Sequence, residues 1–328
     1  MSGVRIALIA GGPSAEAEVS RTSARGVFSA LEQAGHEPTL LELDATLPTR
    51  LATGSYQVAF PVTHGPLGED GCLQGLLEVL ALPYVGSEVL ASALAASKPH
   101  AKAHFRAAGL PVAEDALLAR GPDFPARLRE IRARLGAGLV LKPASGGSAI
   151  GVELLGANSS EAECIAAAER VFALEPLILV EPFVAGLEVT CGVLESAEGL
   201  GALPPTWIRP QAAGHYDFVS KYRAGGSEHV CPAPFEPALV SRIQAAAVLA
   251  HQTLGCRDLS RTDFIVQPEG SGSFVVLEVN TLPGMTPVSL FPEAAAAAGI
   301  AFEALCDRLV RRALARPRRQ AQSAVAMP

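Results

Sequence analysis

Near the C-terminus, two carboxylates, an amide and a guanidinium are spaced so that a β-hairpin would bring them onto one face. Two short runs of aromatic and β-branched residues flank the segment Pro-Glu-Gly-Ser-Gly-Ser, which is typical of strands joined by a turn. A turn centred in that segment places Asp263 opposite Glu278. Because side chains alternate along a strand, Arg261 and Asn280 share their face.

This group of side chains has two interpretations. Like charges that face each other across strands repel, so two carboxylates with an amide oxygen favour a cation between them. All three ligands are oxygens, which suits a hard ion such as Mg²⁺ held jointly with phosphates. The alternative is an ordinary solvated hairpin face whose charges point apart.

A second group suited to binding phosphate lies in the middle of the chain. Lys142 ends the predicted strand Gly-Leu-Val-Leu-Lys and precedes the loop Pro-Ala-Ser-Gly-Gly-Ser-Ala-Ile-Gly. Glycines let backbone N–H groups approach phosphate oxygens, and a lysine adds a point charge. The loop is not a P-loop, because the lysine comes first and a strand is predicted to follow. Glycine-serine loops also occur as simple hairpin turns.

The N-terminal third alternates strands with a helix. Apolar runs predict three strands, over 4–10, 39–43 and 57–62. Strand–helix–strand order implies a parallel sheet whose ligands lie at the carboxyl ends of its strands, where Glu16, Glu18 and His64 fall. A structural histidine is the alternative for His64. The Gly-Gly turn is only a weak dinucleotide-binding signal, because G-x-G-x-x-G is absent.

Three further features predict local structure. Ser87 is a candidate N-cap for a helix, and Ser160 with Glu163 forms a capping box for a helix that ends near Phe172. The segment 211–229 has no regular period and carries histidine, tyrosine, lysine and arginine. Its length and composition favour a lid or binding loop.

Composition excludes several classes of protein. A chain of 328 residues is long enough for two or three domains. It has no apolar run long enough to span a bilayer and no signal peptide, so no membrane association is expected. A net charge of −7 argues against nucleic-acid binding. Six scattered cysteines without a Cys-x-x-Cys pair indicate reduced thiols in a cytoplasmic protein.

In this order and spacing, the chemical groups resemble the D-alanine–D-alanine ligase family of the ATP-grasp superfamily. The resemblance covers residues 4–315. It is carried by Gly11-Gly12-x-Ser14-x-Glu16-x-Glu18-Val19-Ser20, His64-Gly65, Gly68-Glu69-Asp70-Gly71, Leu82-Pro83-Tyr84-x-Gly86-Ser87, Lys142-Pro143, Tyr216-Asp217, Lys221-Tyr222 and Glu278-x-Asn280-Thr281-x-Pro283-Gly284-Met285-Thr286.

The resemblance implies an α/β chain with an ATP-grasp fold and an N-terminal parallel-sheet (pre-ATP-grasp) domain. It also implies a homodimer formed through the N-terminal domain. The expected divisions are an N-terminal substrate-side domain (1–95), a central ATP-grasp subdomain (96–182), a C-terminal ATP-grasp subdomain with the metal site (183–316) and a disordered tail (317–328).

The resemblance implies that ATP lies between the central and C-terminal parts. Lys98 and Lys142 would contact its phosphates, and the loop 145–151, with Ser148, would close over them. Asp263, Glu278 and Asn280 would hold two Mg²⁺ ions, with Mn²⁺ as a substitute. Around adenine and ribose, the resemblance implies Glu181, Pro182, Val184 and Glu188.

The same resemblance implies two amino-acid subsites. Glu16 would hold the ammonium of the first D-alanine, and His64 would help to place it. Arg261 would stabilise the transferred phosphoryl group and, with the backbone N–H of Gly284, the tetrahedral oxyanion. The second substrate would be held by Lys221, Ser289 and Leu290. Closure of the lid would join Glu16, Ser148 and Tyr222.

The implied activity is ADP-forming ligation of two D-alanines through an acyl phosphate, for peptidoglycan precursors in cell-wall synthesis. Tyr222 at its position goes with an amine rather than a hydroxy-acid acceptor. Two departures from the family pattern are Pro182, where a lysine is usual, and Ser-Gly-Gly-Ser-Ala in the phosphate loop.

Three other readings remain open. A ligase of the same fold could make another D-Ala-X or a secondary-metabolite dipeptide. A non-catalytic nucleotide-binding protein would be expected to lose Arg261 or a metal ligand, yet all are present. A dehydrogenase is supported only by the Gly-Gly turn and the strand order.

Overall fold

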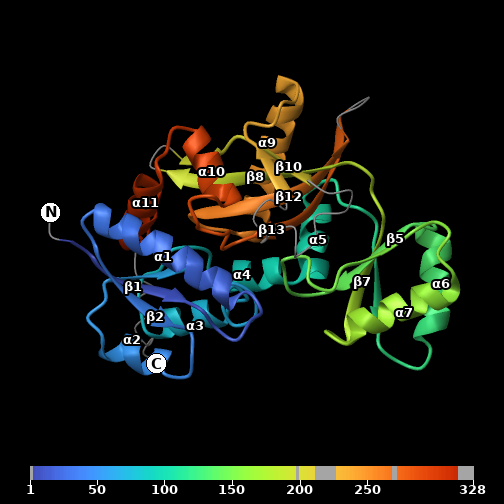
Figure 1. Ribbon diagram of the computed structural model, residues 1–328, viewed down its shortest axis with the longest axis horizontal. Coiled ribbons are helices and arrows are strands. Elements are labelled where there is room, and N and C mark those ends of the chain that lie inside the picture. Colours follow the sequence, from blue (N-terminus) through green and yellow to red (C-terminus); the bar gives the residue numbers. More distant parts are fainter. Residues whose placement is uncertain (1–2, 197–198, 211–226, 268–271, 317–328) are drawn as a thin grey trace, which may run out of the picture.

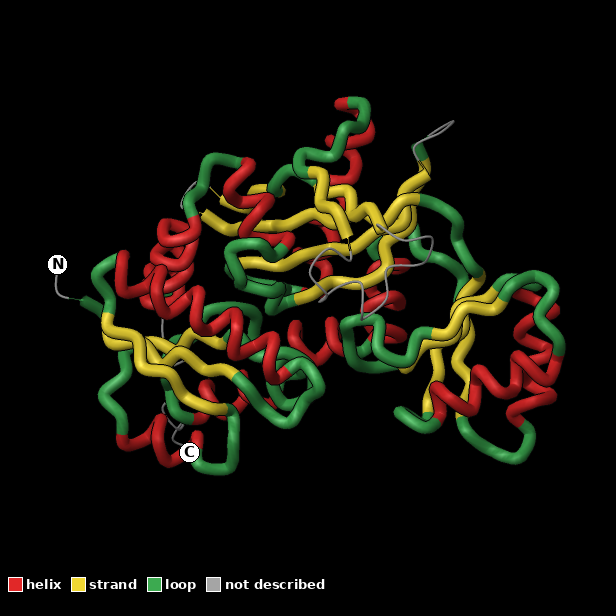
Figure 2. Tube along the Cα trace, viewed as in Figure 1, coloured by secondary structure: helices red, strands yellow, loops and turns green. Residues whose placement is uncertain are grey.

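Three β-sheets with flanking helices make up this computed structural model (Figure 1). The structure describes residues 3–196, 199–210, 227–267 and 272–316. The N-terminal sheet and the small middle sheet lie at opposite ends of the molecule, and the largest sheet spans the region above them (Figure 2). Within the described ranges, no helix is both long and apolar enough to cross a membrane.

The N-terminal sheet has the order β2-β1-β3, and both pairings are parallel, as the strand–helix–strand order predicted. One face packs against the helix that follows β1 and against two helices from the C-terminal end of the chain, and the other face against two short helices. Its elements are β1 (Arg5–Ala10), α1 (Ala17–Gln33), β2 (Glu37–Glu42), α2 (Leu47–Thr53), β3 (Val58–Pro61), α3 (Cys72–Val79) and α4 (Val89–Ala96).

The middle sheet is antiparallel, in the order β4-β7-β5-β6, and its core residues pack against two helices. The predicted capping box is confirmed: the Glu163 N–H donates to Ser160 Oγ (3.3 Å), and the Ser160 N–H donates to the Glu163 carboxylate (2.7 Å). Its elements are β4 (Ala116–Ala119), α6 (Phe124–Leu135), β5 (Leu139–Pro143), β6 (Glu153–Leu155), α7 (Glu161–Phe172) and β7 (Leu177–Pro182).

The largest sheet has the order β11-β10-β8-β12-β13, with β9 paired to β8. Helices α5 and α9 contribute to the core on one side, and α10 and α11 lie between the other side and the N-terminal sheet. Its elements are α5 (Lys98–Ala107), β8 (Leu187–Ser196), β9 (Gly199–Ala202), β10 (Thr206–Pro210), β11 (Ser227–Val230), α9 (Pro237–Leu254), β12 (Leu259–Gln267), β13 (Ser273–Asn280), α10 (Leu290–Ala297) and α11 (Phe302–Ala315).

The predicted hairpin is confirmed as β12 and β13, and Asp263 is the register partner of Glu278, as expected. A bulge between Asp263 and Phe264 shifts the register only beyond that pair. The prediction for Ser87 was wrong by one residue, because α4 has Glu88 as its N-cap. The Ser87 hydroxyl instead accepts the N–H of Arg257 (3.1 Å), a contact across 170 positions that no local pattern reveals.

Candidate active site

A cavity of about 770 Å³ lies where the three sheets face one another. All but two of the candidate residues line it, although they come from positions as distant as Glu16 and Leu290. The exceptions, Lys221 and Tyr222, lie outside the described residues. Those that line the cavity are Glu16, His64, Lys98, Lys142, Ser148, Glu181, Pro182, Val184, Glu188, Arg261, Asp263, Glu278, Asn280, Gly284, Ser289 and Leu290.

The hairpin presents a preorganised guanidinium–carboxylate pair to this cavity. Arg261 donates two hydrogen bonds to Asp263, from Nε to Oδ1 (2.8 Å) and from Nη2 to Oδ2 (2.7 Å). The hydroxyl of Thr190 on the neighbouring strand β8 also donates to Asp263 Oδ1 (2.7 Å). Bidentate pairing fixes both side chains, so they face the cavity in a defined orientation.

The oxygen ligands expected for a metal ion meet at the same place. Glu278 Oε2 lies 3.4 Å from Lys98 Nζ, and Asn280 Oδ1 accepts the N–H of Leu282 (3.0 Å). Among the described residues, no group of three or more His, Cys, Asp or Glu side chains is arranged so that it could hold a metal ion by itself. A cation here would therefore take two carboxylates and one amide oxygen from the protein, an all-oxygen set that fits a Mg²⁺ ion whose other ligands are phosphate oxygens and water.

The glycine-rich loop reaches from the middle sheet to the N-terminal domain. Ser148 Oγ donates a hydrogen bond to Glu16 Oε1, and Lys98 Nζ donates to the carbonyl of Gly146. Ser148 and Ala149 both have φ of 55°, a region that non-glycine residues enter at a cost. The contacts of Gly146 and Ser148 hold this part of the loop over the cavity.

A buried cluster of charges forms the wall beside the loop. The Glu181 carboxylate pairs with both Lys142 and Lys102. Burial opposes ionisation of Glu181, but the two ammonium groups hold its pKa below the usual range, so it is charged. The sequence patterns did not identify Lys102, because its partner lies 79 positions away.

Glu181 is followed by the residues expected around adenine. Pro182 ends β7 and is the register partner of Leu139, and the N–H of Phe183 donates to the carbonyl of Gly138 (2.9 Å). The sharp change from strand to loop places Pro182 and Val184 in the cavity wall. The wall here offers backbone and apolar atoms, which suit a flat heterocycle.

His64 and Glu69 lie on the N-terminal side of the cavity. Burial lowers the pKa of His64, which Arg261 reinforces and Glu16 opposes, so the imidazole is neutral. Burial raises the pKa of Glu69 to about 8, although its Oε1 accepts the N–H of Gly65 (2.8 Å). The sequence singled out the Gly-Glu-Asp-Gly motif without giving Glu69 a role, because nothing local indicates that Glu69 lines the cavity.

The opposite end of the cavity forms a small cradle before α10. Ser289 Oγ accepts the N–H of Thr286 (3.1 Å) and lies 2.7 Å from Thr286 Oγ1. A Cβ at Gly284 would lie 3.1 Å from Ser289 Oγ, so a residue without a side chain keeps the cradle open.

His229 also lines the cavity and pairs with Glu293 (2.6 Å). The sequence did not single out His229, because it ends a segment with no periodic pattern.

Families and individual proteins of known function resemble this chain in sequence. The sequence model of the D-ala D-ala ligase C-terminus matches residues 104–311, and that of the D-ala D-ala ligase N-terminus matches residues 48–87. The D-alanine–D-alanine ligase of Gluconobacter oxydans is 43% identical over 322 residues, which cover 95% of this chain and 100% of the relative.

Two solved structures resemble the chain over nearly its whole length. The Bacillus anthracis D-alanine–D-alanine ligase complexed with ATP aligns with a TM-score of 0.79 at 29% identity, covering 95% of this chain and 98% of the other. A D-Ala:D-Ser ligase of Enterococcus faecalis aligns with a TM-score of 0.81 at 30% identity, covering 95% and 100%. The predicted ATP-grasp fold with an N-terminal parallel sheet is confirmed. The chain belongs to the D-alanine–D-alanine ligase family.

Proposed function

We propose that this protein joins two D-alanines into D-alanyl-D-alanine, converting one ATP to ADP and phosphate, to supply a peptidoglycan precursor. One observation carries the proposal: a single cavity contains the glycine-rich loop with its lysines, the carboxylate hairpin, and Glu16 with His64. The reaction needs ATP and two amino acids bound side by side, because the phosphoryl group is transferred to the first amino acid before the second one attacks it. The three groups of side chains supply binding sites for these substrates in one cavity.

ATP binds between the middle sheet and the largest sheet. Lys98 and Lys142 neutralise its phosphates, and the loop 145–151 covers them. The base lies against Glu181, Pro182 and Val184, with Glu188 at the ribose. Asp263, Glu278 and Asn280 hold two Mg²⁺ ions, or Mn²⁺ in their place. When bound, these ions offset the charge of the phosphate oxygens.

In the first step, the carboxylate of the first D-alanine attacks the γ-phosphorus and ADP leaves, giving an acyl phosphate. Glu16 pairs with the ammonium group, and His64 helps to position the substrate. Arg261 lies on the face of the hairpin that also presents Asp263 and Glu278, where it stabilises negative charge on the transferred group.

In the second step, the amine of the second D-alanine attacks the acyl carbon, loses a proton, and displaces phosphate. Arg261 and the backbone N–H of Gly284 stabilise the oxyanion. Lys221 binds the second substrate as well, and its carboxylate lies in the cradle formed by Ser289 and Leu290. Ser148, Glu16 and Tyr222 hold the lid closed, which keeps water from the acyl phosphate.

Purified protein with Mg²⁺ and ATP tests the function. D-alanine should stimulate phosphate release, and one dipeptide should appear for each ADP. An absence of dipeptide from enzyme that binds ATP would disprove the proposal.

A second candidate, formation of another D-Ala-X dipeptide, is favoured by the similarity to a D-Ala:D-Ser ligase. A panel of acceptors separates the two. D-alanine should exceed D-serine and D-lactate at neutral pH, and faster depsipeptide formation from D-lactate would contradict the assignment of Tyr222 to an amine acceptor.

We also propose a cytoplasmic homodimer formed through the N-terminal domain. Two apolar side chains there, Val79 and Leu90, are 85% and 69% exposed, and an interface at this surface would bury them. All six cysteines are free thiols, in keeping with a reducing compartment. Light scattering after gel filtration should give twice the mass of the chain, and Leu90→Glu should give the monomer.

A further inference from the structure

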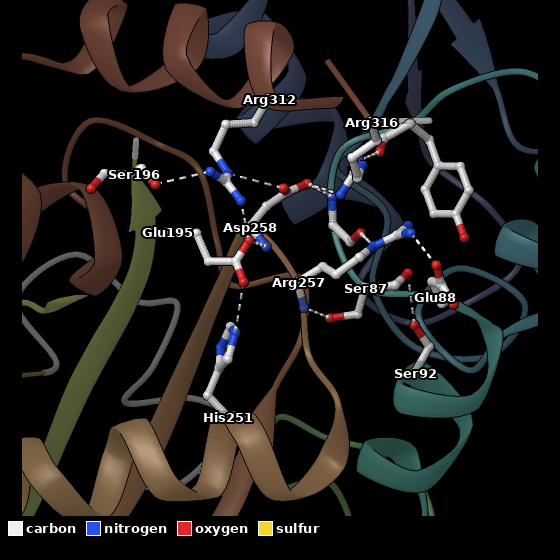
Figure 3. A network of polar contacts seen from close by, with 12 residues as sticks. Ser87, Glu88, Ser92, Glu195, Ser196, His251, Arg257, Asp258, Arg312 and Arg316 are labelled. Atoms are coloured by element: carbon white, nitrogen blue, oxygen red, sulfur yellow. Dashed lines mark hydrogen bonds and ion pairs between the residues drawn. The ribbon is translucent and has the colours of Figure 1, made fainter. Parts of the chain in front are cut away.

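A polar network outside the cavity joins the N-terminal domain to the base of the hairpin (Figure 3). At its centre is Asp258, which is 0% exposed and immediately precedes β12. Its Oδ2 accepts the N–H of Gly86 (2.8 Å) and Nη1 of Arg316 (2.9 Å), and its Oδ1 lies 3.5 Å from Nε of Arg312. One carboxylate therefore connects the N-terminal domain, the end of α11 and the hairpin.

Arg257 adds a second set of contacts to the same N-terminal segment. Its N–H donates to Ser87 Oγ (3.1 Å), and its Nε donates to the carbonyl of Gly86 (3.2 Å). Its guanidinium pairs with Glu88 and lies 5.2 Å from the ring centre of Tyr84. The adjacent residues Arg257 and Asp258 thus contact the loop 84–88 along most of its length.

The other strand of the hairpin touches this loop as well. Gly86 has a φ of 101°, and a Cβ there would lie 3.0 Å from Cδ2 of Leu282. The N–H of Leu282 donates to Oδ1 of Asn280, the last residue of β13. The loop therefore packs against both strands at the open end of the hairpin, beside Asp258 before β12 and beside Leu282 after β13.

On its N-terminal side, the same loop is fixed to the strand that leads to His64. The N–H of Val85 donates to the carbonyl of Ala59 (3.0 Å), and the N–H of Ala59 donates to the carbonyl of Pro83 (2.8 Å). Ala59 belongs to β3, and His64 follows the end of that strand by three residues. Hydrogen bonds therefore connect Asp258, through the loop 84–88 and β3, to the side of the cavity where His64 lies.

Asp258 adopts a conformation that its surroundings impose. Its φ is 60°, in the left-handed region that aspartate and asparagine tolerate better than most residues. Such conformations persist where tertiary contacts determine them. The network's contacts thus set the backbone at the start of β12, three residues before Arg261 and five before Asp263.

We propose that Asp258 is a positioning residue that sets the distance between the amino-acid side of the cavity, at Glu16 and His64, and the phosphoryl side, at Arg261 and Asp263. The proposal rests on the proposed function. Its consequence is chemical coupling: correct spacing lets the second amine reach the acyl phosphate before water does. Loosened spacing allows hydrolysis of the acyl phosphate, which releases phosphate and D-alanine and wastes ATP.

Asp258→Asn tests this, because asparagine keeps the size and the backbone tolerance of aspartate but loses the charge. We expect the yield of dipeptide per ADP to fall well below that of the wild type. We also expect kcat for dipeptide to fall about tenfold or more, since small misplacements of reacting groups are costly. The KM for ATP should change less than about threefold, because Asp258 is outside the nucleotide side of the cavity.

Asp307→Asn is the matched control. Asp307 lies on α11, the helix that carries Arg312, and pairs with His36 in the N-terminal domain (2.9 Å), but it does not touch the network around Asp258. Its loss should lower the melting temperature while leaving the yield of dipeptide per ADP unchanged. A general effect of weakened domain packing would lower the yield in both variants and would overturn the proposal.

Arg257→Gln is a second variant that tests the proposal if Asp258→Asn does not fold. This substitution leaves no buried charge unpaired, so we expect the variant to fold. It should reduce the yield of dipeptide per ADP in the same direction. A folded variant of either residue with wild-type yield and kcat would overturn the proposal. Failure of the wild type itself to form dipeptide would instead reject the proposed function.

Discussion

The hydroxyl of Ser148, in the glycine-rich loop, donates a hydrogen bond to the carboxylate of Glu16 in the N-terminal domain. The two residues are 132 positions apart, and both line the cavity. This contact links the phosphate-covering loop directly to the side chain proposed to bind the first amino acid. We therefore expect closure of the loop and occupation of the proposed amino-acid subsite to be coupled.

Removal of this contact with Ser148→Ala should lower kcat/KM for D-alanine by about tenfold to a hundredfold, because a hydrogen bond to a charged group contributes about 1.5–3 kcal/mol. Steady-state ADP release measures the effect. Ser145→Ala is the control from the same loop, since its backbone N–H, rather than its hydroxyl, contacts Glu175 (2.9 Å). Equal losses in both variants would contradict a specific role for the Ser148 contact.

Glu278→Ala should lower dipeptide formation by more than about a hundredfold, because it removes one of two proposed carboxylate ligands. The affinity for Mg²⁺–ATP, measured by calorimetry, should fall more than the affinity for ATP without metal. Glu303→Ala, an exposed glutamate on α11, serves as the control. Unchanged turnover in Glu278→Ala would reject the metal site.

Glu181→Gln should destabilise the protein by about 3–5 kcal/mol, because it leaves the buried Lys102 and Lys142 without their shared carboxylate. Denaturant unfolding measures the change. Glu153→Gln on β6 also breaks an ion pair, with Arg170, but at the surface, and should change stability little. Similar losses of stability in the two variants would show that the buried charged cluster stabilises the protein no more than a surface ion pair does.

The stability of the protein should depend on pH because the pKa of Glu69 is raised. Its pKa is raised to about 8 in the folded protein, mainly by burial, so its stabilising contribution is complete below its usual pKa near 4.5 and is lost as the pH rises toward 8. Glu69→Gln resembles the protonated form and should lack this loss. Relative to the variant, the wild type should therefore melt at a lower temperature at pH 8.5 than at pH 5.5. A constant difference between their melting temperatures would contradict the raised pKa.

Local patterns predicted the parts of the site that depend on a single element. Alternation on two strands, together with a turn centred in the glycine-serine segment, was enough to place Asp263 opposite Glu278. The capping box at Ser160 was equally local. The grouping of residues that are distant in the sequence came from the family resemblance, because local periodicity carries no information about such contacts.

Other features could not be predicted, because they arise from packing between distant segments. The bounds of helix α9 were not predicted: its alanine-rich sequence has little contrast between its faces, and its burial against the largest sheet becomes visible only in the fold. The pairing of Lys102 with Glu181 and the contacts of Asp258 with Gly86 cross 79 and 172 positions. Such partners are set by topology rather than by local sequence.

The last described helix, α11, completes a core that begins with the first strand. Leu305, Leu309 and Val310 belong to the same buried cluster as Ile6 and Leu8 of β1. During synthesis, this face of the N-terminal sheet therefore stays partly uncovered, with only α1 against it, until α10 and α11 have been made. We expect the N-terminal sheet to mature late and to depend on chaperones that shield this face during synthesis.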